Sequence, residues 1–184
     1  MRRYCLIFLF FLVVGAGNTG CGTVYKVAVD KRSLGMQADD EKITMAIRDK
    51  FVADDTVKIL HVSTYCYTGH VYLAGEYETL AQKKRILKLA GEVEGVKSIK
   101  GHFLPKKKDD SCGTKDNLKL VAKVKVKLIK DEDISSTGIE VKALQCNIIL
   151  FGIVGSQGEI KKAVAHAKSV EGVRSVTTYL RVMN

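Results

Sequence analysis

The sequence predicts an α+β protein built from two tandem copies of one small domain. Sliding the chain of 184 residues against itself by 77 positions aligns residues 39–103 with 116–180 without a gap. Thirteen of these 65 pairs are identical, and they cluster at 93–98 and around Leu73 and Gly75. In both copies the hydrophobic periodicity follows the order helix, strand, strand, helix, strand. We therefore expect two three-stranded mixed sheets, each with two helices packed on one face.

The N-terminus has the three-part layout of a secretory signal. Arg2 and Arg3 precede an apolar run at 4–14, and small and polar residues follow it. The run is too short for a membrane-spanning helix, because about 20 apolar residues are needed to cross the hydrocarbon core. Residues 1–20 are therefore predicted to be a signal peptide, with a retained anchor as the alternative.

The end of this segment resembles the lipobox of bacterial lipoproteins, because Gly20 precedes Cys21 after a short apolar run. The resemblance implies that the thiol of Cys21 is acylated with a fatty acid such as palmitate, and that residues 21–38 form a lipidated N-terminus and tether. Gly22 rather than aspartate follows the cysteine. For lipoproteins of this kind, that residue implies the outer membrane, facing the periplasm.

The first element of each copy is predicted to be a helix. In copy one, Ile43, Ile47 and Phe51 have helical spacing, and Asp39 and Asp40 lie at the N-terminal end, where the helix dipole favours negative charge. The counterpart at 118–128 alternates apolar and polar residues almost like a strand. Its repeat phase nevertheless places Leu120, Val124 and Leu128 on the positions of the copy-one stripe, so we predict a helix there too.

Two β-rich runs follow in each copy, at 62–67 and 70–76 and again at 139–144 and 147–153. Thr68-Gly69 between the first pair is a tight hairpin signal. The second hairpin lacks the glycine, and we expect Asn147 to take the left-handed conformation there.

The second helix of each copy opens at a capping box. The boxes are Thr79 with Gln82 and Ser156 with Glu159, at equivalent positions of the repeat. The helices are expected to end before Gly95 and Gly172. Last strands are predicted at 97–103 and 174–182, and a polar linker at 104–115 holds the one proline of the chain.

The G-x-V-x-L-x-G pattern at 69–75 and the V-x-G-V end of the second helix resemble the BON domain of bacterial envelope proteins. The resemblance covers domains at 39–103 and 116–184. With the lipobox and the segment 30–40 before them, the whole chain resembles outer-membrane lipoproteins with two BON domains. It implies a non-enzymatic protein that binds anionic phospholipid and supports envelope integrity. Soluble periplasmic relatives share the two domains, and the lipobox distinguishes the two groups.

Charge points to the second copy as the lipid-binding half. The whole chain carries a net charge of +10, which favours an anionic partner, and export makes nucleic acid a poor one. Copy one is neutral, whereas 116–184 has 11 basic and seven acidic residues. The helix at 118–128 carries lysines beside a second apolar strip that points away from its core stripe, which is typical of an interfacial helix. The candidate lipid-binding residues are Leu118, Lys119, Ala122, Lys123, Val126, Lys127, Ile129 and Lys130.

Two alternatives stay open. The lysine face is merely solvated if Leu118 and Ile129 are covered by the other domain. The protein is instead an adaptor if its BON domains dock another envelope protein, such as a secretin or a division component, without recognising lipid.

No constellation for catalysis, a metal or a cofactor stands out. The histidines are scattered and lie at no metal-ligand spacing, and no serine or cysteine lies in a nucleophile motif, so we expect a protein that is not an enzyme. Removing Cys21 to the lipid leaves Cys66, Cys112 and Cys146 in the domains. Whether two of them form a disulfide is left open.

Overall fold

The computed structural model describes residues 32–57 and 62–183. The predicted signal peptide and Cys21 lie outside this part of the chain. The first domain contains, in order, α2 (Leu34–Val52), β1 (Val62–Tyr67), β2 (His70–Tyr77), α3 (Leu80–Gly91) and β3 (Ser98–Pro105). The second contains α4 (Thr114–Lys130), β4 (Ile139–Leu144), β5 (Asn147–Val154), α5 (Gln157–Lys168) and β6 (Ser175–Val182), with a 3-10 turn at Ser136–Gly138 before β4.

Each domain has one three-stranded mixed sheet. β2 is central in the first sheet, antiparallel to β1 and parallel to β3, and β5 occupies the same place between β4 and β6. Parallel neighbours need a crossover, which α3 and α5 provide. The predicted α+β class and the helix at 118–128 are confirmed.

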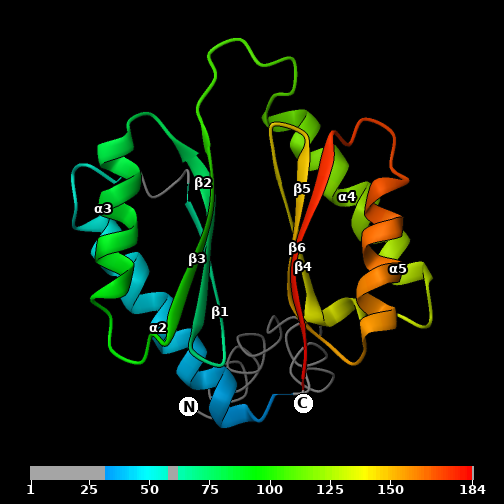
Figure 1. Ribbon diagram of the computed structural model, residues 1–184, viewed down its shortest axis with the longest axis horizontal. Coiled ribbons are helices and arrows are strands. Elements are labelled where there is room, and N and C mark those ends of the chain that lie inside the picture. Colours follow the sequence, from blue (N-terminus) through cyan, green and yellow to red (C-terminus); the bar gives the residue numbers. More distant parts are fainter. Residues whose placement is uncertain (1–31, 58–61, 184) are drawn as a thin grey trace, which may run out of the picture.

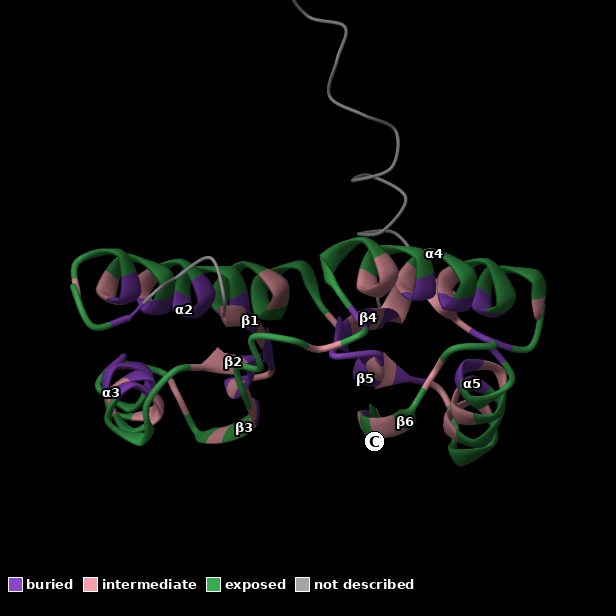
Figure 2. Ribbon diagram, turned by 90° about the horizontal axis from the view of Figure 1, so that it is seen from above, coloured by how far each residue is buried: buried purple, intermediate pink, exposed green. Residues whose placement is uncertain are grey.

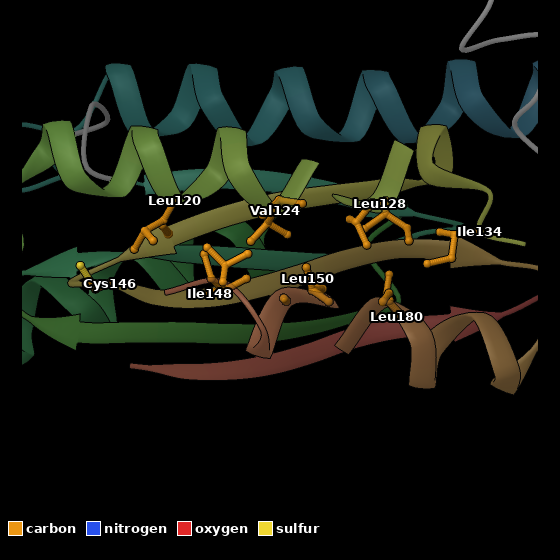
Figure 3. Close-up of a cluster of buried hydrophobic side chains, with 14 of the residues drawn as sticks. Leu120, Val124, Leu128, Ile134, Cys146, Ile148, Leu150 and Leu180 are labelled. Carbon is orange, nitrogen blue, oxygen red and sulfur yellow. The ribbon is translucent and has the colours of Figure 1, made fainter. Parts of the chain in front are cut away.

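The helices cover the outer face of each sheet and enclose one core per domain (Figure 1). In the second domain, Leu120, Val124 and Leu128 of α4 point toward Ile148 and Leu150 of β5 (Figure 3). The stripe that the repeat phase predicted is therefore the buried side of α4. Ile47 and Phe51 of α2 are fully buried at the equivalent place in the first domain.

The start of α2 differs from the prediction. Ser33 caps the helix, its hydroxyl accepting a hydrogen bond from the Met36 amide at 3.2 Å, so the helix begins at Leu34. Asp40 consequently lies in the second turn and is buried, while Asp39 is exposed. The expectation that both aspartates lie at the N-terminal end was wrong, because five residues of the predicted tether, 34–38, precede them in the helix.

The second helices begin where the capping boxes predicted. The hydroxyls of Thr79 and Ser156 accept hydrogen bonds from the amides of Gln82 and Glu159, both at 3.1 Å. The side chains of Gln82 and Glu159 accept hydrogen bonds in turn from the amides of Glu78 and Gly155. In a standard capping box the donor is the amide of the N-cap residue, which is one position later. The repeated sequence signal thus produces the same local structure twice.

The second hairpin turn also differs from the prediction. Gln145 and Cys146 have positive φ angles of 50° and 59°, as Thr68 and Gly69 do in the first domain at 54° and 79°. Asn147 already belongs to β5 and is not left-handed. A non-glycine residue is held in this conformation because Cys146 forms a disulfide with Cys112 and donates its amide to the side chain of Asn117 at 3.0 Å.

The faces of the two sheets that carry no helix pack against each other, so the molecule is layered helix, sheet, sheet, helix (Figure 1). The rings of Phe151 and Tyr179 stack at 5.4 Å, and Tyr65 stacks on Phe151 at 4.9 Å. Tyr72 contacts both Phe151 and Tyr179. At one end of the interface, the side-chain amide of Gln145 donates hydrogen bonds to Glu76 and to the Pro105 carbonyl, each at 2.8 Å. An aromatic core therefore joins the two domains.

Candidate functional site

The outer side of α4 carries all eight residues predicted to bind lipid, and the structure leaves every one of them exposed. The apolar members are large and uncovered: Leu118 is 65% exposed, Val126 49% and Ile129 68%. The other domain packs on the opposite side of the second sheet and covers neither Leu118 nor Ile129. The alternative in which the first domain buries these two residues is therefore wrong.

The four lysines in this set lie beside the apolar strip. Within the described residues, Lys119, Lys123, Lys127 and Lys130 form no ion pair, whereas Lys125 pairs with Glu140 of β4 at 3.5 Å. A row of unneutralised ammonium groups beside exposed apolar side chains suits a surface that is anionic and apolar at once.

Three interactions hold the start of α4 in place. The disulfide between Cys112 and Cys146 ties the chain two residues before the helix to the β4–β5 turn. Asn117 accepts the Cys146 amide, and Asp116 accepts the amide of Gly113 at 3.0 Å. The sequence left the cysteine pairing open, and the fold settles it by bringing these two residues to a Cα distance of 5.8 Å. Cys66 is a buried free thiol.

Sequence reasoning missed the equivalent anchor in the first domain. The carboxylate of Asp40 accepts the amides of Thr68 and Gly69 at 2.8 and 2.9 Å and the thiol of Cys66 at 3.2 Å. It also pairs with Arg32 at 2.6 Å. Burial alone raises the pKa of Asp40, but these hydrogen bonds together hold its pKa below the ordinary value. The available signal was the repeat itself, since Asn117 occupies the matching position.

Sequence reasoning also missed the interface between the domains, which the strand tyrosines help to form. Tyr67 and Tyr72 are buried against Leu144 and Phe151 of the other domain. The signal was present, because both faces of β5 are apolar, and a strand buried on both faces loses the polar alternation of a solvated sheet.

One interface residue makes the stability of the protein depend on pH. The ring of His102 lies 3.3 Å from the Tyr179 hydroxyl across the interface, and burial lowers the pKa of this histidine below its ordinary 6.5. The folded protein therefore prefers the neutral ring, so stability is full above the ordinary value and declines as pH falls from there toward the lowered pKa. Urea unfolding between pH 7 and 5 should show a smaller decline for His102→Gln than for the parent. Equal declines would contradict this assignment.

A family model described as BON domain matches residues 39–103 and 116–184. The chain belongs to the BON-domain family. We refer to the two matched segments as BON1 and BON2. BON1 and BON2 pack against each other through their sheets. The first helix of each domain, α2 in BON1 and α4 in BON2, therefore lies on the outside of the molecule.

Several proteins are similar over most of the chain. Osmotically-inducible protein Y of Escherichia coli is 30% identical over 158 residues, covering 85% of this chain and 79% of that protein. Outer membrane lipoprotein DolP of Haemophilus influenzae is 26% identical over 173 residues, covering 94% and 87%. A 21 kDa hemolysin of Actinobacillus pleuropneumoniae is 26% identical over 157 residues, covering 85% and 79%. The C-terminal domain of CdsD, from the type III secretion system of Chlamydia trachomatis, matches with a TM-score of 0.34 at 10% identity, covering 76% and 96%, too weak a likeness to carry an argument.

Two further findings concern the described residues alone. None of their helices is long and apolar enough to cross a bilayer. No group of three or more His, Cys, Asp or Glu side chains among them is placed to hold a metal ion.

Proposed function

We propose that this BON-domain protein is an outer-membrane lipoprotein that faces the periplasm. In this proposal it is anchored through Cys21, binds anionic phospholipid through α4 of BON2 and supports envelope integrity. The exposed side of α4 carries the proposal, because apolar side chains and unpaired lysines share one helix surface. The relationship to an outer membrane lipoprotein supports the compartment.

Both halves of that surface are needed for useful affinity. A lysine near an anionic surface contributes about 1 kcal/mol, so four contribute roughly 4 before screening and entropy are counted. Burying the apolar strip adds about 25 cal/mol for each Å² removed from water. Because the anchor at Cys21 would raise the local concentration, a modest intrinsic affinity suffices.

The two contributions should respond differently to mutation. Changing Lys119, Lys123, Lys127 and Lys130 to glutamine should weaken binding of the unlipidated protein to phosphatidylglycerol vesicles at least tenfold and flatten its salt dependence, because salt screens charge. Val126→Asp should weaken binding even at low salt. Vesicle co-sedimentation across a salt series measures both effects. Neither variant touches the buried side of α4, so circular dichroism should show intact folding.

A matched control removes the same number of charges elsewhere. Lys84 and Lys88 of α3 and Lys161 and Lys168 of α5 are exposed, and these two helices lie on the side of the molecule opposite α2 and α4 (Figure 2). Their glutamine variant should bind vesicles like the parent apart from a small loss of long-range attraction. If the α4 variants fold and bind like the parent, or if the parent ignores headgroup charge, the proposal is wrong and an adaptor that docks protein is the better description.

A further inference from the structure

The exposed apolar residues are not scattered over the molecule. Eight large apolar side chains are exposed in the described part of the chain, and all but Leu80 of α3 belong to α2 or α4. These two helices run in opposite directions (Figure 1), and both lie on one side of the molecule, where their outer sides are exposed (Figure 2). The strip on α4 thus has a counterpart on α2.

The counterpart on α2 lies opposite the core of BON1. At 3.6 residues per turn, Leu34, Met45 and Val52 fall almost on one line along the helix, and Ile47 and Phe51 point to the other side. Met45 is 55% exposed and Val52 69%. The 77-residue repeat places Met45 and Val52 at the positions of Ala122 and Ile129. Both domains therefore expose apolar side chains at equivalent places on their first helices.

The two strips differ in charge. At the positions of Leu118 and Val126 of α4, α2 has Glu41 and Asp49. Only two of the four α4 lysines have a lysine at the equivalent position of α2, namely Lys42 and Lys50. Lys50 already pairs with Glu92 at 3.3 Å. The surface of α2 therefore offers apolar contact with little net attraction for an anionic partner.

The predicted anchor enters the fold beside α2. Arg32 pairs with Asp40 and lies over the ring of Tyr67 at 5.0 Å, so the chain is attached to BON1 immediately before the helix. The stretch from Cys21 to Arg32 spans at most about 36 Å when extended. A bilayer that holds acyl chains on Cys21 is consequently within reach of α2 as well as α4.

We propose that α2 is a second membrane contact, so that BON1 and BON2 rest together on one bilayer of anionic phospholipid. In this arrangement α4 supplies the attraction for lipid headgroups, and Met45 and Val52 enter the boundary between headgroups and acyl chains. A bilayer suits this surface better than a peptide does, because the two strips belong to different domains but lie on the same side of the molecule, where one flat membrane can contact both (Figure 2). The inference rests on the proposed function and extends it to BON1.

Tryptophan scanning tests the arrangement directly, because the chain contains no tryptophan. Met45→Trp on α2, Ile129→Trp on α4 and Leu80→Trp on α3 each place one indole at an exposed apolar position in a full-length chain that carries Cys21→Ser. Vesicles of phosphatidylglycerol with brominated phosphatidylcholine should quench the first two indoles. They should leave the Leu80→Trp emission in its aqueous position, because α3 lies on the opposite side.

The outcomes separate this inference from the proposed function. Quenching of Ile129→Trp without quenching of Met45→Trp overturns the contact by α2 and leaves lipid binding by α4 intact. No quenching at either position overturns both. If the Met45→Trp emission shifts with protein concentration in the absence of lipid, a second copy of the chain covers α2, and the inference is wrong.

A binding measurement provides an independent readout. Met45→Asp should weaken vesicle binding by roughly tenfold, because it puts a charge in place of an apolar side chain that the lipid boundary would cover. Leu80→Asp is the matched control and should bind like the parent. Both residues are exposed, so both variants should fold. Equal binding by the two variants would contradict the second contact.

Discussion

Cys21→Ser is expected to move the protein from the outer-membrane fraction to the soluble periplasmic fraction. Acyl chains contribute about 0.8 kcal/mol for each buried CH₂ group, and two or more chains hold a protein stably where one holds it marginally. The lysines of α4 provide only a few kcal/mol and are screened by salt. The binding free energy lost with the acyl chains should therefore exceed the binding free energy that the α4 surface provides.

Cell fractionation with immunoblotting after a high-salt wash measures this loss. Residual binding of Cys21→Ser at low salt should disappear when the four α4 lysines are also changed to glutamine. Cys5→Ser is the matched control, since that residue lies in the predicted signal peptide, and it should leave the protein on the membrane. If Cys21→Ser still sediments with outer membranes after the wash, a lipid on that cysteine is not what retains the protein.

Asp40→Ala is expected to lower the free energy of unfolding by about 3 kcal/mol, because it removes one partner of a buried ion pair and leaves buried donors without an acceptor. The donors are the amides of Thr68 and Gly69 and the thiol of Cys66. Burial and the neighbouring carboxylate raise the pKa of that thiol to about 12, so it stays protonated as a donor. Urea unfolding of the soluble chain measures the effect.

Asp39→Ala is the matched control for this prediction. Asp39 is the adjacent residue, exposed and paired with Lys42 only across one helical turn at 3.5 Å, so its loss should change stability by less than about 0.5 kcal/mol. Equal losses for the two variants would show that Asp40 does not tie α2 to the hairpin.

The pH dependence supplies a second check on Asp40. Because its pKa is lowered in the folded protein, its contribution is complete above the ordinary value of 3.8 and is lost as pH falls through the lowered pKa. Asp40→Asn should remove that part of the acid sensitivity. It should retain some stability, since Asn117 accepts a turn amide at the matching position of BON2.

The sequence by itself determined the features that depend on residues a few positions apart. The 77-residue repeat predicted the element order twice, and the hydroxyls of Thr79 and Ser156 cap their helices as the local motif requires. The repeat phase also separated the buried stripe of α4 from its outer strip. That separation placed Leu118, Val126 and Ile129 on the side of α4 away from its core, because helical phase decides which residues share a side.

Only the tertiary structure decided the features that join distant segments. Whether Leu118 and Ile129 are covered depends on where BON1 packs, and the aromatic contacts of Phe151 with Tyr65 and Tyr72 direct it to the sheet face instead. Cys146 pairs with Cys112 because the β4–β5 turn lies beside the start of α4. The same packing of sheet on sheet places α2 and α4 on one side of the molecule. No local pattern encodes these contacts, since each requires two surfaces that meet only when both domains have folded.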